Sequence, residues 1–297
     1  MSSAQSAPTT TFRWRDGLLQ RVSDTAGASA PLASAPLASD SFLVEDGRVL
    51  ALDLHRSRFL AAVAAVRPAG ARSGTTQDEG AVFAVGSGAA PSIGEGAAFW
   101  DTVVAALPRT GDWFPRVDLV DELGTPSFRY LERPAPGRAR SVVLRTHDGP
   151  DPRTTPRIKG PDLAVLHRVR EAAAARGAGD VVIRSPGGFV VEGGYSALVW
   201  WRGESLCLPV PELERIDSVT ANVVVTIATA LGTDVLWEET EPHDLDGLEV
   251  WCLNSLHGIR IVTEWIDGPG VAEMPGRLAA WRSRLGRLSR PLATLRE

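Results

Sequence analysis

Apolar and polar positions along this chain follow two different periods, and each period predicts one kind of element. Apolar residues three or four positions apart indicate amphipathic helices, whereas strict alternation indicates strands with one buried face. The helical pattern starts with Asp53 as a predicted N-cap and recurs along the chain. The predicted helices cover Asp53–Val66, Ala97–Leu107, Leu163 to about Gly177, Ser218–Leu231 and Leu278–Leu288.

Alternating segments between these helices predict strands. Asp46-Gly47 is a strong hairpin signal, because both residues tolerate the left-handed conformation that a tight turn needs. It predicts a turn between strands Ser41–Val44 and Val49–Leu52. Further strands are predicted at Thr11–Leu19 (with a turn at Asp16-Gly17), Arg116–Val120, Ser127–Leu131, Val142–Thr146, Glu249–Leu253 and Ile259–Trp265. An antiparallel meander is predicted from Val181–Arg184, Phe189–Glu192 and Tyr195–Trp201.

Segments rich in Pro, Gly, Ala and Ser mark the breaks in this pattern. Ala26–Ser39 contains APLAS twice and is predicted to be a low-complexity loop, and Gly86–Gly96 a glycine-rich loop. Glu132–Arg138 (ERPAPGR) is the predicted interdomain linker. The sequence thus predicts a mixed α/β chain with a smaller N-terminal α/β domain over 1–131, its first ten residues frayed. A linker over 132–138 and a larger C-terminal domain over 139–297 follow.

Composition narrows the class of protein. Of the 297 residues, 44% are hydrophobic and 23% charged, which excludes a disordered chain. The net charge of −5 leaves no basic footprint for nucleic acid. No apolar run is long enough to span a membrane, and no signal peptide begins the sequence, so we expect a cytoplasmic protein. Two cysteines and five scattered histidines predict no metal site.

Lysine is nearly absent from this chain. Lysine and arginine together number 31, and Lys159 is the only lysine. Arginine stays protonated, whereas a lysine amine can lose its proton and form a Schiff base with a carbonyl group. Lys159 also stands before a Gly-Pro pair, at the predicted end of a strand or loop entering a helix, where catalytic side chains are often placed. It is therefore a candidate nucleophile.

Two other segments carry candidate chemistry. Glu192 follows Val190 and Val191, so the alternation breaks there, and the carboxylate lies either at a rim or buried beside a cation. Gly193 and Gly194 would let a flat ligand or another backbone approach closely. The start of the helix at Ser218 offers backbone donors for a phosphate, although plain N-capping by Asp217 or Ser218 explains the same residues.

Together these segments resemble the class IV, or fold-type IV, pyridoxal-phosphate enzymes: branched-chain and D-amino-acid aminotransferases and aminodeoxychorismate lyase. Asp53-Leu-His55-Arg56-Ser57-Arg58-Phe59 is similar to the family's His-x-x-Arg-Leu segment, and Lys159-Gly-Pro-Asp162 to its Lys-x-x-Asn segment. Gly187-Gly-Phe-Val-Val-Glu192-Gly193 is similar to its Gly-x-x-x-Glu-Gly hairpin, and Ser218-Val219-Thr220-Ala221 to its Gly-Ile-Thr-Arg phosphate turn. Leu253-Asn254-Ser255-Leu256 matches more weakly a turn with a phosphate-binding hydroxyl.

The resemblance implies a two-domain fold-type IV enzyme with a barrel-like C-terminal domain that binds pyridoxal 5'-phosphate. It implies that Lys159 forms the Schiff base and moves the substrate α-proton, and that Glu192 meets the pyridine nitrogen. It further implies that the cofactor phosphate is held by Arg58, Val219, Thr220 and Ser255. The implied reaction is amino-group transfer between an amino acid and a 2-oxo acid, in a homodimer. Arg116, Arg129 and Arg157 are unranked candidates for the substrate carboxylate.

Three departures from the family pattern keep the reaction open. Asp162 stands where the family has asparagine, Ala197 replaces another asparagine, and Ala221 replaces the arginine of the phosphate turn. Aminodeoxychorismate lyase, which eliminates pyruvate with the same cofactor, is the first alternative, favoured by Asp162 and by the Asn254-Ser-Leu segment. A non-catalytic relative on the same scaffold is the second.

Overall fold

The computed structural model describes residues 8–22, 35–68, 83–85 and 91–293. Contacts between residues divide the chain into two compact units. The amino-terminal unit consists of the described parts of Met1–Pro136, Ile158–Pro161 and Arg290–Glu297. The carboxyl-terminal unit consists of Gly137–Arg157 and Asp162–Ser289. Lys159 thus belongs to the amino-terminal unit, although both flanking segments belong to the other. The domain boundaries at 131 and 139 stay a prediction.

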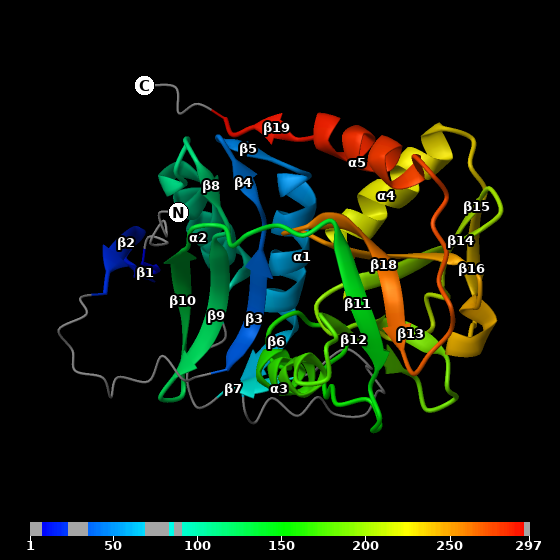
Figure 1. Ribbon diagram of the computed structural model, residues 1–297. Coiled ribbons are helices and arrows are strands. Elements are labelled where there is room, and N and C mark those ends of the chain that lie inside the picture. The colour runs from blue at the N-terminus through cyan, green and yellow to red at the C-terminus, as the bar shows by residue number, and fades with distance from the viewer. Residues whose placement is uncertain (1–7, 23–34, 69–82, 86–90, 294–297) are drawn as a thin grey trace. The chain divides into compact units, whose positions relative to one another are not determined.

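The amino-terminal unit contains a five-stranded antiparallel sheet in the order β2-β1-β10-β9-β3. Its strands are β1 (Thr10–Arg15), β2 (Leu18–Arg21), β3 (Pro36–Ser41), β9 (Arg116–Glu122) and β10 (Thr125–Glu132). Helices α1 (Leu52–Ala65) and α2 (Ile93–Ala106) pack against this sheet (Figure 1). Smaller sheets contain β4 (Val44–Glu45), β5 (Arg48–Val49), β8 (Asp112–Trp113) and β19 (Arg290–Pro291), and β6 (Val66–Pro68) with β7 (Phe83–Val85).

The predicted hairpin turn is confirmed, but its strands are shorter than predicted. Asp46 and Gly47 have φ angles of 44° and 71°, and β4 pairs with β5 across them. β3 begins at Pro36, inside the segment predicted as a low-complexity loop over Ala26–Ser39. That prediction is wrong for its last residues, because Ala38 is buried in the core and Ser39 pairs with β9. Residues 23–34 of the segment, and 1–7 of the predicted frayed terminus, lie outside the described residues.

The first two helices begin differently from the prediction. The N-cap of α1 is Ala51, whose φ is 46°, and it makes no side-chain cap bond. The predicted N-cap Asp53 is therefore wrong; it lies in the first turn, where a negative charge favours the helix dipole. α2 begins before the predicted position, because Ser92 and Glu95 form a capping box. The predicted loop Gly86–Gly96 thus ends in a helix, and its residues 86–90 lie outside the described residues.

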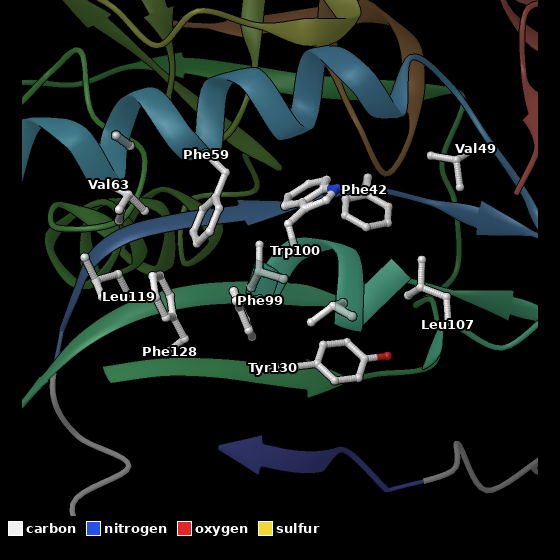
Figure 2. Close-up of a cluster of buried hydrophobic side chains, with 14 of the residues drawn as sticks. Phe42, Val49, Phe59, Val63, Phe99, Trp100, Leu107, Leu119, Phe128 and Tyr130 are labelled. Carbon is white, nitrogen blue, oxygen red and sulfur yellow. The ribbon is translucent and has the colours of Figure 1, made fainter. Parts of the chain in front are cut away.

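Aromatic side chains fill the core between α1, α2 and the sheet. Figure 2 shows Phe59 extending from α1 toward Phe99 and Phe128. The rings of Phe99 and Phe128 stack with their centroids 4.8 Å apart, and Phe59 lies 6.1 Å from Phe99. Phe99 is completely buried. Because aromatic rings bury large apolar areas, this cluster dominates the packing of the amino-terminal unit.

The carboxyl-terminal unit contains one curled, mixed sheet of eight strands in the order β13-β12-β11-β18-β17-β14-β15-β16 (Figure 1). The strands are β11 (Ser141–Thr146), β12 (Asp180–Arg184), β13 (Val190–Gly193), β14 (Ala197–Arg202), β15 (Ser205–Pro209), β16 (Val235–Glu238), β17 (Glu249–Asn254) and β18 (Gly258–Ile266). The helices are α3 (Leu163–Ala174), α4 (Val219–Ala230), the short 3-10 helix η1 (Pro242–Leu245) and α5 (Arg277–Arg287).

The predicted meander is only partly correct. β12 and β13 pair antiparallel, but β14 pairs with β15 and β17 instead of β13. β15 and β16 were missed because no clear alternation marks them. The break in alternation at Val190 and Val191 is a β-bulge: Ile183 opposes Glu192 and Arg184 opposes Val190, so Val191 is the extra residue. Such bulges re-aim neighbouring side chains and recur beside functional sites.

The architecture confirms the predicted mixed α/β class with a larger, curled carboxyl-terminal sheet. Within the described ranges, no helix has the length and apolar character needed to cross a membrane.

Replacing Phe99 by alanine tests the aromatic core. We expect Phe99→Ala to lower the free energy of unfolding by about 3–5 kcal/mol, since it removes a buried ring and leaves a cavity. Leu123→Ala is the control, because Leu123 is fully exposed and should change stability by at most about 0.5 kcal/mol. Denaturant unfolding measures both. Equal stabilities of the two variants would contradict the packing described.

Candidate functional site

Lys159 lies in a loop four residues before α3, which confirms the predicted loop placement. Its carbonyl oxygen accepts a hydrogen bond of 2.7 Å from the backbone N–H of Ser39 on β3. Gly160 makes this approach possible: its φ is 139°, and a Cβ there would lie 3.0 Å from the backbone of Ala38 and Ser39. A side chain at position 160 would therefore push the lysine away from β3.

Asp162 closes the loop that carries Lys159. Its Oδ1 accepts hydrogen bonds from the N–H and hydroxyl of Thr154, at 3.0 and 2.8 Å. Its Oδ2 accepts from the N–H and hydroxyl of Thr155, at 2.9 and 3.0 Å. An asparagine has only one acceptor oxygen in its side chain, so it could not satisfy all four donors. The departure from the family's asparagine thus has a structural reason.

Arg58 lies on α1 beside a carboxylate that the sequence did not single out. The Nε and Nη2 of Arg58 donate to the two oxygens of Asp40, each at 2.8 Å. The Nδ1 of His55 donates to Oδ1 of Asp40, also at 2.8 Å. Asp40 is completely buried and the Arg58 side chain is 12% exposed. The His-x-x-Arg segment therefore presents its arginine in a fixed, bidentate geometry.

The charges of this cluster are strongly coupled. Burial would raise the pKa of Asp40, but Arg58 and His55 hold it well below its usual value. Burial lowers the pKa of His55, and the positive charges of Arg58 and Lys159 lower it further, against the opposing effect of Asp40. His55 is thus neutral at pH 7, and the charge of the Lys159 amine affects its pKa.

Glu192 is buried on β13 beside a cation. Of the two predicted alternatives, a rim position or burial beside a cation, the second is therefore correct. The residue is 5% exposed, and its Oε1 accepts a hydrogen bond from Nη1 of Arg153. The Arg153 side chain is 2% exposed, and its Nε and Nη2 donate to the two oxygens of Asp151 at 2.9 and 2.6 Å. A guanidinium with both a bidentate and a single carboxylate partner thus compensates the buried glutamate.

Glu192 and Arg153 both contact the segment that leads into α4. The N–H of Ile216 donates to Oε2 of Glu192 at 3.3 Å, and Nη2 of Arg153 donates to the carbonyl of Glu214 at 3.0 Å. α4 begins three residues after Ile216. Glu192 and the start of α4 are therefore held together within the carboxyl-terminal unit.

The start of α4 places Val219 and Thr220 in its first turn. Ser218 is the N-cap, and its hydroxyl accepts the N–H of Ala221 at 3.3 Å, so the predicted capping role is present. Val219 and Thr220 are both buried. The first N–H groups of a helix have no partner inside it, and the helix dipole favours an anion there. This end can thus receive a phosphate in addition to its cap.

Gly193 and Gly194 leave room for the protein's own groups rather than for a ligand. A Cβ at Gly193 would clash with the hydroxyl of Ser196. A Cβ at Gly194 would lie 2.9 Å from the Cγ of Arg170 and 3.0 Å from Oδ1 of Asp180. The hydroxyl of Ser196 donates to Oδ2 of Asp180 at 2.8 Å. The two glycines, which directly follow Glu192, therefore make room for the polar side chains of Ser196, Arg170 and Asp180.

Ser255 lies in the turn between β17 and β18. Oδ1 of Asn254 accepts the N–H groups of Leu256 and His257, at 3.2 and 2.8 Å, and this fixes the turn. Nδ1 of His257 accepts the N–H of Ala139 at 3.1 Å. Burial and nearby arginines lower the pKa of His257 to about 4. The phosphate role of Ser255 stays a prediction.

The three arginine candidates for a substrate carboxylate differ in their partners. Arg116 and Arg129 share the buried Asp118: Nε of Arg116 donates at 2.6 Å, and Nη2 of Arg129 at 2.7 Å. The Arg116 side chain is 22% exposed and that of Arg129 only 9%. Arg157 is 60% exposed and pairs with Glu214 at the surface. Arg116 is thus both fixed and accessible.

Sequence reasoning missed the two partners that hold the site residues, Asp40 and Arg153. Asp40 lies 18 positions from Arg58 and Arg153 lies 39 positions from Glu192, and no spacing rule joins them. The available signal was general: a buried carboxylate needs a cation. Of the remaining departures, Ala197 is buried opposite Leu253, and Ala221 lies in the first turn of α4. The structure assigns neither a further role.

The chain is similar to known proteins in both sequence and fold. Residues 126–265 match the model of the family described as amino-transferase class IV. No curated protein matches the sequence.

Solved structures match nearly the whole chain. A hypothetical aminotransferase from Mycobacterium tuberculosis, in a PLP-bound form, is 17% identical, with a TM-score of 0.71 over 95% of this chain and 98% of that one. A fold IV transaminase from Curtobacterium pusillum is 16% identical, with a TM-score of 0.69 over 93% and 97%. A branched-chain aminotransferase from Thermoproteus uzoniensis with norvaline is 17% identical, with a TM-score of 0.70 over 96% and 100%.

Asp162→Asn tests the closure of the Lys159 loop. The amide cannot accept all four donors of Thr154 and Thr155, so we expect a loss of about 1–3 kcal/mol in the free energy of unfolding and faster hydrogen exchange at both threonines. Asp217→Asn is the control, since it makes the same change in an exposed residue. Unchanged hydrogen exchange at Thr154 and Thr155 in Asp162→Asn would contradict the role of Asp162 in holding this loop.

The pH dependence of stability tests the environment of His257. Its folded pKa of about 4 lies below the usual value of 6.5, so the unfolded chain binds a proton first as the pH falls. We expect His257 to contribute a loss of stability between pH 6.5 and about 4. In His257→Asn, the slope of unfolding free energy against pH should be smaller in this range. Identical slopes in both proteins would show that the histidine is not held neutral.

Proposed function

Because residues 126–265 match the model of the amino-transferase class IV family, we propose that this protein is a pyridoxal-phosphate-dependent aminotransferase that uses Lys159. The observation that carries the proposal is the buried Glu192, tied through Ile216 to the start of α4. Such an arrangement offers a carboxylate for a ring nitrogen and helix N–H groups for a phosphate within one rigid segment.

The donor set of the chain fits pyridoxal 5'-phosphate. When bound, this cofactor withdraws electrons from a substrate amine and so makes its α-proton labile. A primary amine is present in Lys159, a buried carboxylate in Glu192, and phosphate donors in Thr220, the Val219 backbone, Arg58 and Ser255. These groups match the aldehyde, the ring nitrogen and the phosphate of the cofactor in chemical type.

Lys159 would hold the cofactor covalently and then move the substrate proton. Its amine reacts only when uncharged, and the neutral His55 beside the Asp40–Arg58 pair adds no further positive charge to its surroundings. As a free amine, Nζ would serve as the base that takes the substrate α-proton and as the acid that gives it back. Gly160 and the Ser39 N–H keep the lysine backbone fixed during this transfer.

Arg116 is the best of the three arginines for a substrate carboxylate. It is fixed by Asp118 through Nε, yet its side chain is more exposed than that of Arg129. Arg157, in an exposed pair, is held less firmly. We assign the substrates as an amino acid and a 2-oxo acid, and the assembly as a homodimer, on the family resemblance alone.

Spectra and turnover test the proposal together. The purified protein mixed with pyridoxal 5'-phosphate should develop a visible absorption band, and Lys159→Ala should lose both the band and activity. Lys159→Arg is the matched control, since it keeps the charge without a reactive amine. Amino-acid donors should bleach the band, and a 2-oxo acid should restore it.

The lyase alternative predicts a different result in the same assay. Pyruvate released from aminodeoxychorismate without any added 2-oxo acid would select elimination over transfer. A protein that stays colourless with the cofactor would contradict both enzymatic assignments and favour the non-catalytic relative.

A further inference from the structure

We propose that Arg153, anchored by Asp151, is a positioning residue that keeps Glu192 ionised and aims its Oε2 at the ring nitrogen, so that the nitrogen is bound protonated. This inference rests on the proposed function and deepens it, because it names the residue on which the electron-withdrawing form of the cofactor depends. Arg153 touches neither substrate nor cofactor in this assignment and acts only through Glu192.

The burial of Glu192 makes a permanent partner necessary. A carboxylate that is 5% exposed would take up a proton if it stood alone, because ionisation in a buried position is costly. A protonated glutamate donates its hydrogen to a ring nitrogen, whereas an ionised one accepts a hydrogen from it. The charge state of Glu192 therefore decides whether the ring nitrogen carries the proton.

The surroundings of Arg153 keep its guanidinium positively charged and fixed in place. Burial opposes its charge, but the hydrogen bond to Asp151 and the charge of Glu192 raise its pKa above the usual value. Its side chain is 2% exposed and its Nε, Nη1 and Nη2 all have acceptors. The guanidinium is thus held in one orientation, with one N–H edge on Asp151 and Nη1 on Glu192.

The hydrogen bonds also set the direction of Glu192. Arg153 occupies Oε1, and the N–H of Ile216 reaches Oε2 at 3.3 Å. A carboxylate oxygen accepts more than one hydrogen bond, so Oε2 keeps capacity for a ring N–H. Arg153 also binds the Glu214 carbonyl, so one side chain positions both the carboxylate and the segment before α4.

Arg215 is a second cation that interacts electrostatically with Glu192, and it does not replace Arg153. Its Nη1 and Nη2 donate to the carbonyls of Pro209, Val210 and Leu213, at 2.6–3.0 Å. Burial lowers the pKa of Arg215, which Glu192 raises in part. It therefore adds to the positive potential, but its hydrogen bonds hold the backbone of the loop rather than the carboxylate.

Nitrogen NMR of the protein loaded with pyridoxal 5'-phosphate, labelled with ¹⁵N in the ring, tests the proposal. At neutral pH the wild-type protein should show the shift of a protonated ring nitrogen. Arg153→Met removes the charge at similar length and should show the unprotonated shift, as Glu192→Gln should. Because a hydrogen bond to a charged group is lost, we expect cofactor binding to weaken about 10- to 100-fold.

Two further variants show whether the effect is specific to Arg153 or follows from the loss of any paired arginine. Asp151→Asn leaves Arg153 in place but weakens its anchor, so the shift and affinity should lie between those of wild type and Arg153→Met. Arg277→Met makes the same substitution at a buried arginine paired with Glu249, and should leave the ring nitrogen protonated. If Arg153→Met does not fold, Asp151→Asn decides the matter.

The outcomes separate this inference from the proposed function. A wild-type protein that binds no cofactor overturns the proposed function and the role of Arg153 with it. A wild-type protein that binds it, with a protonated ring nitrogen retained at wild-type affinity in both Arg153→Met and Asp151→Asn, overturns the role of Arg153 alone. A protonated nitrogen in wild type that is lost in Arg153→Met supports it.

Discussion

A buried carboxylate needs a cation or several hydrogen-bond donors to compensate its charge, and buried carboxylate–arginine pairs occur in both units of this protein. Five such carboxylates are at most 5% exposed, and each pairs with at least one arginine. They are Asp40 with Arg58, Asp118 with Arg116 and Arg129, Asp180 with Arg170 and Arg260, Glu192 with Arg153, and Glu249 with Arg277. Three of these five groups contain a candidate site residue, so buried ion pairs also hold side chains of the candidate site.

The same requirement explains why a chain with many arginines can use its one lysine differently. Arginine binds a carboxylate through two parallel hydrogen bonds and keeps its charge when buried, which suits every structural pair named above. Lysine would do this less well, but its amine can be uncharged. The loop closed by Asp162 and the contact of Gly160 with β3 then hold Lys159 in place. Arginine thus forms the buried ion pairs, and the single lysine is the residue that we propose as the reactive amine.

The sequence predicted the class of the fold, because that class follows from local patterns. The hairpin at Asp46-Gly47 and the loop before α3 are local features and were placed correctly. The break in alternation at Val190-Val191 was noticed in the sequence, and the structure shows that it is a bulge. The pairing of β14 with β17 was not predicted, because it joins residues about 50 positions apart in the sequence. Arg153 and Asp40 escaped notice for the same reason: their partners are distant in sequence, and only the folded chain brings them together.

Reductive labelling tests the central claim, that Lys159 is the amine to which pyridoxal 5'-phosphate attaches. The protein is mixed with the cofactor, reduced with borohydride, digested and analysed by mass spectrometry. Because Lys159 is the only lysine, the chain's other primary amine is its amino terminus, and the two are easily separated. The account predicts the reduced pyridoxyl group on the peptide that contains Lys159. A labelled amino terminus with an unmodified Lys159 peptide, or no label at all, would contradict it.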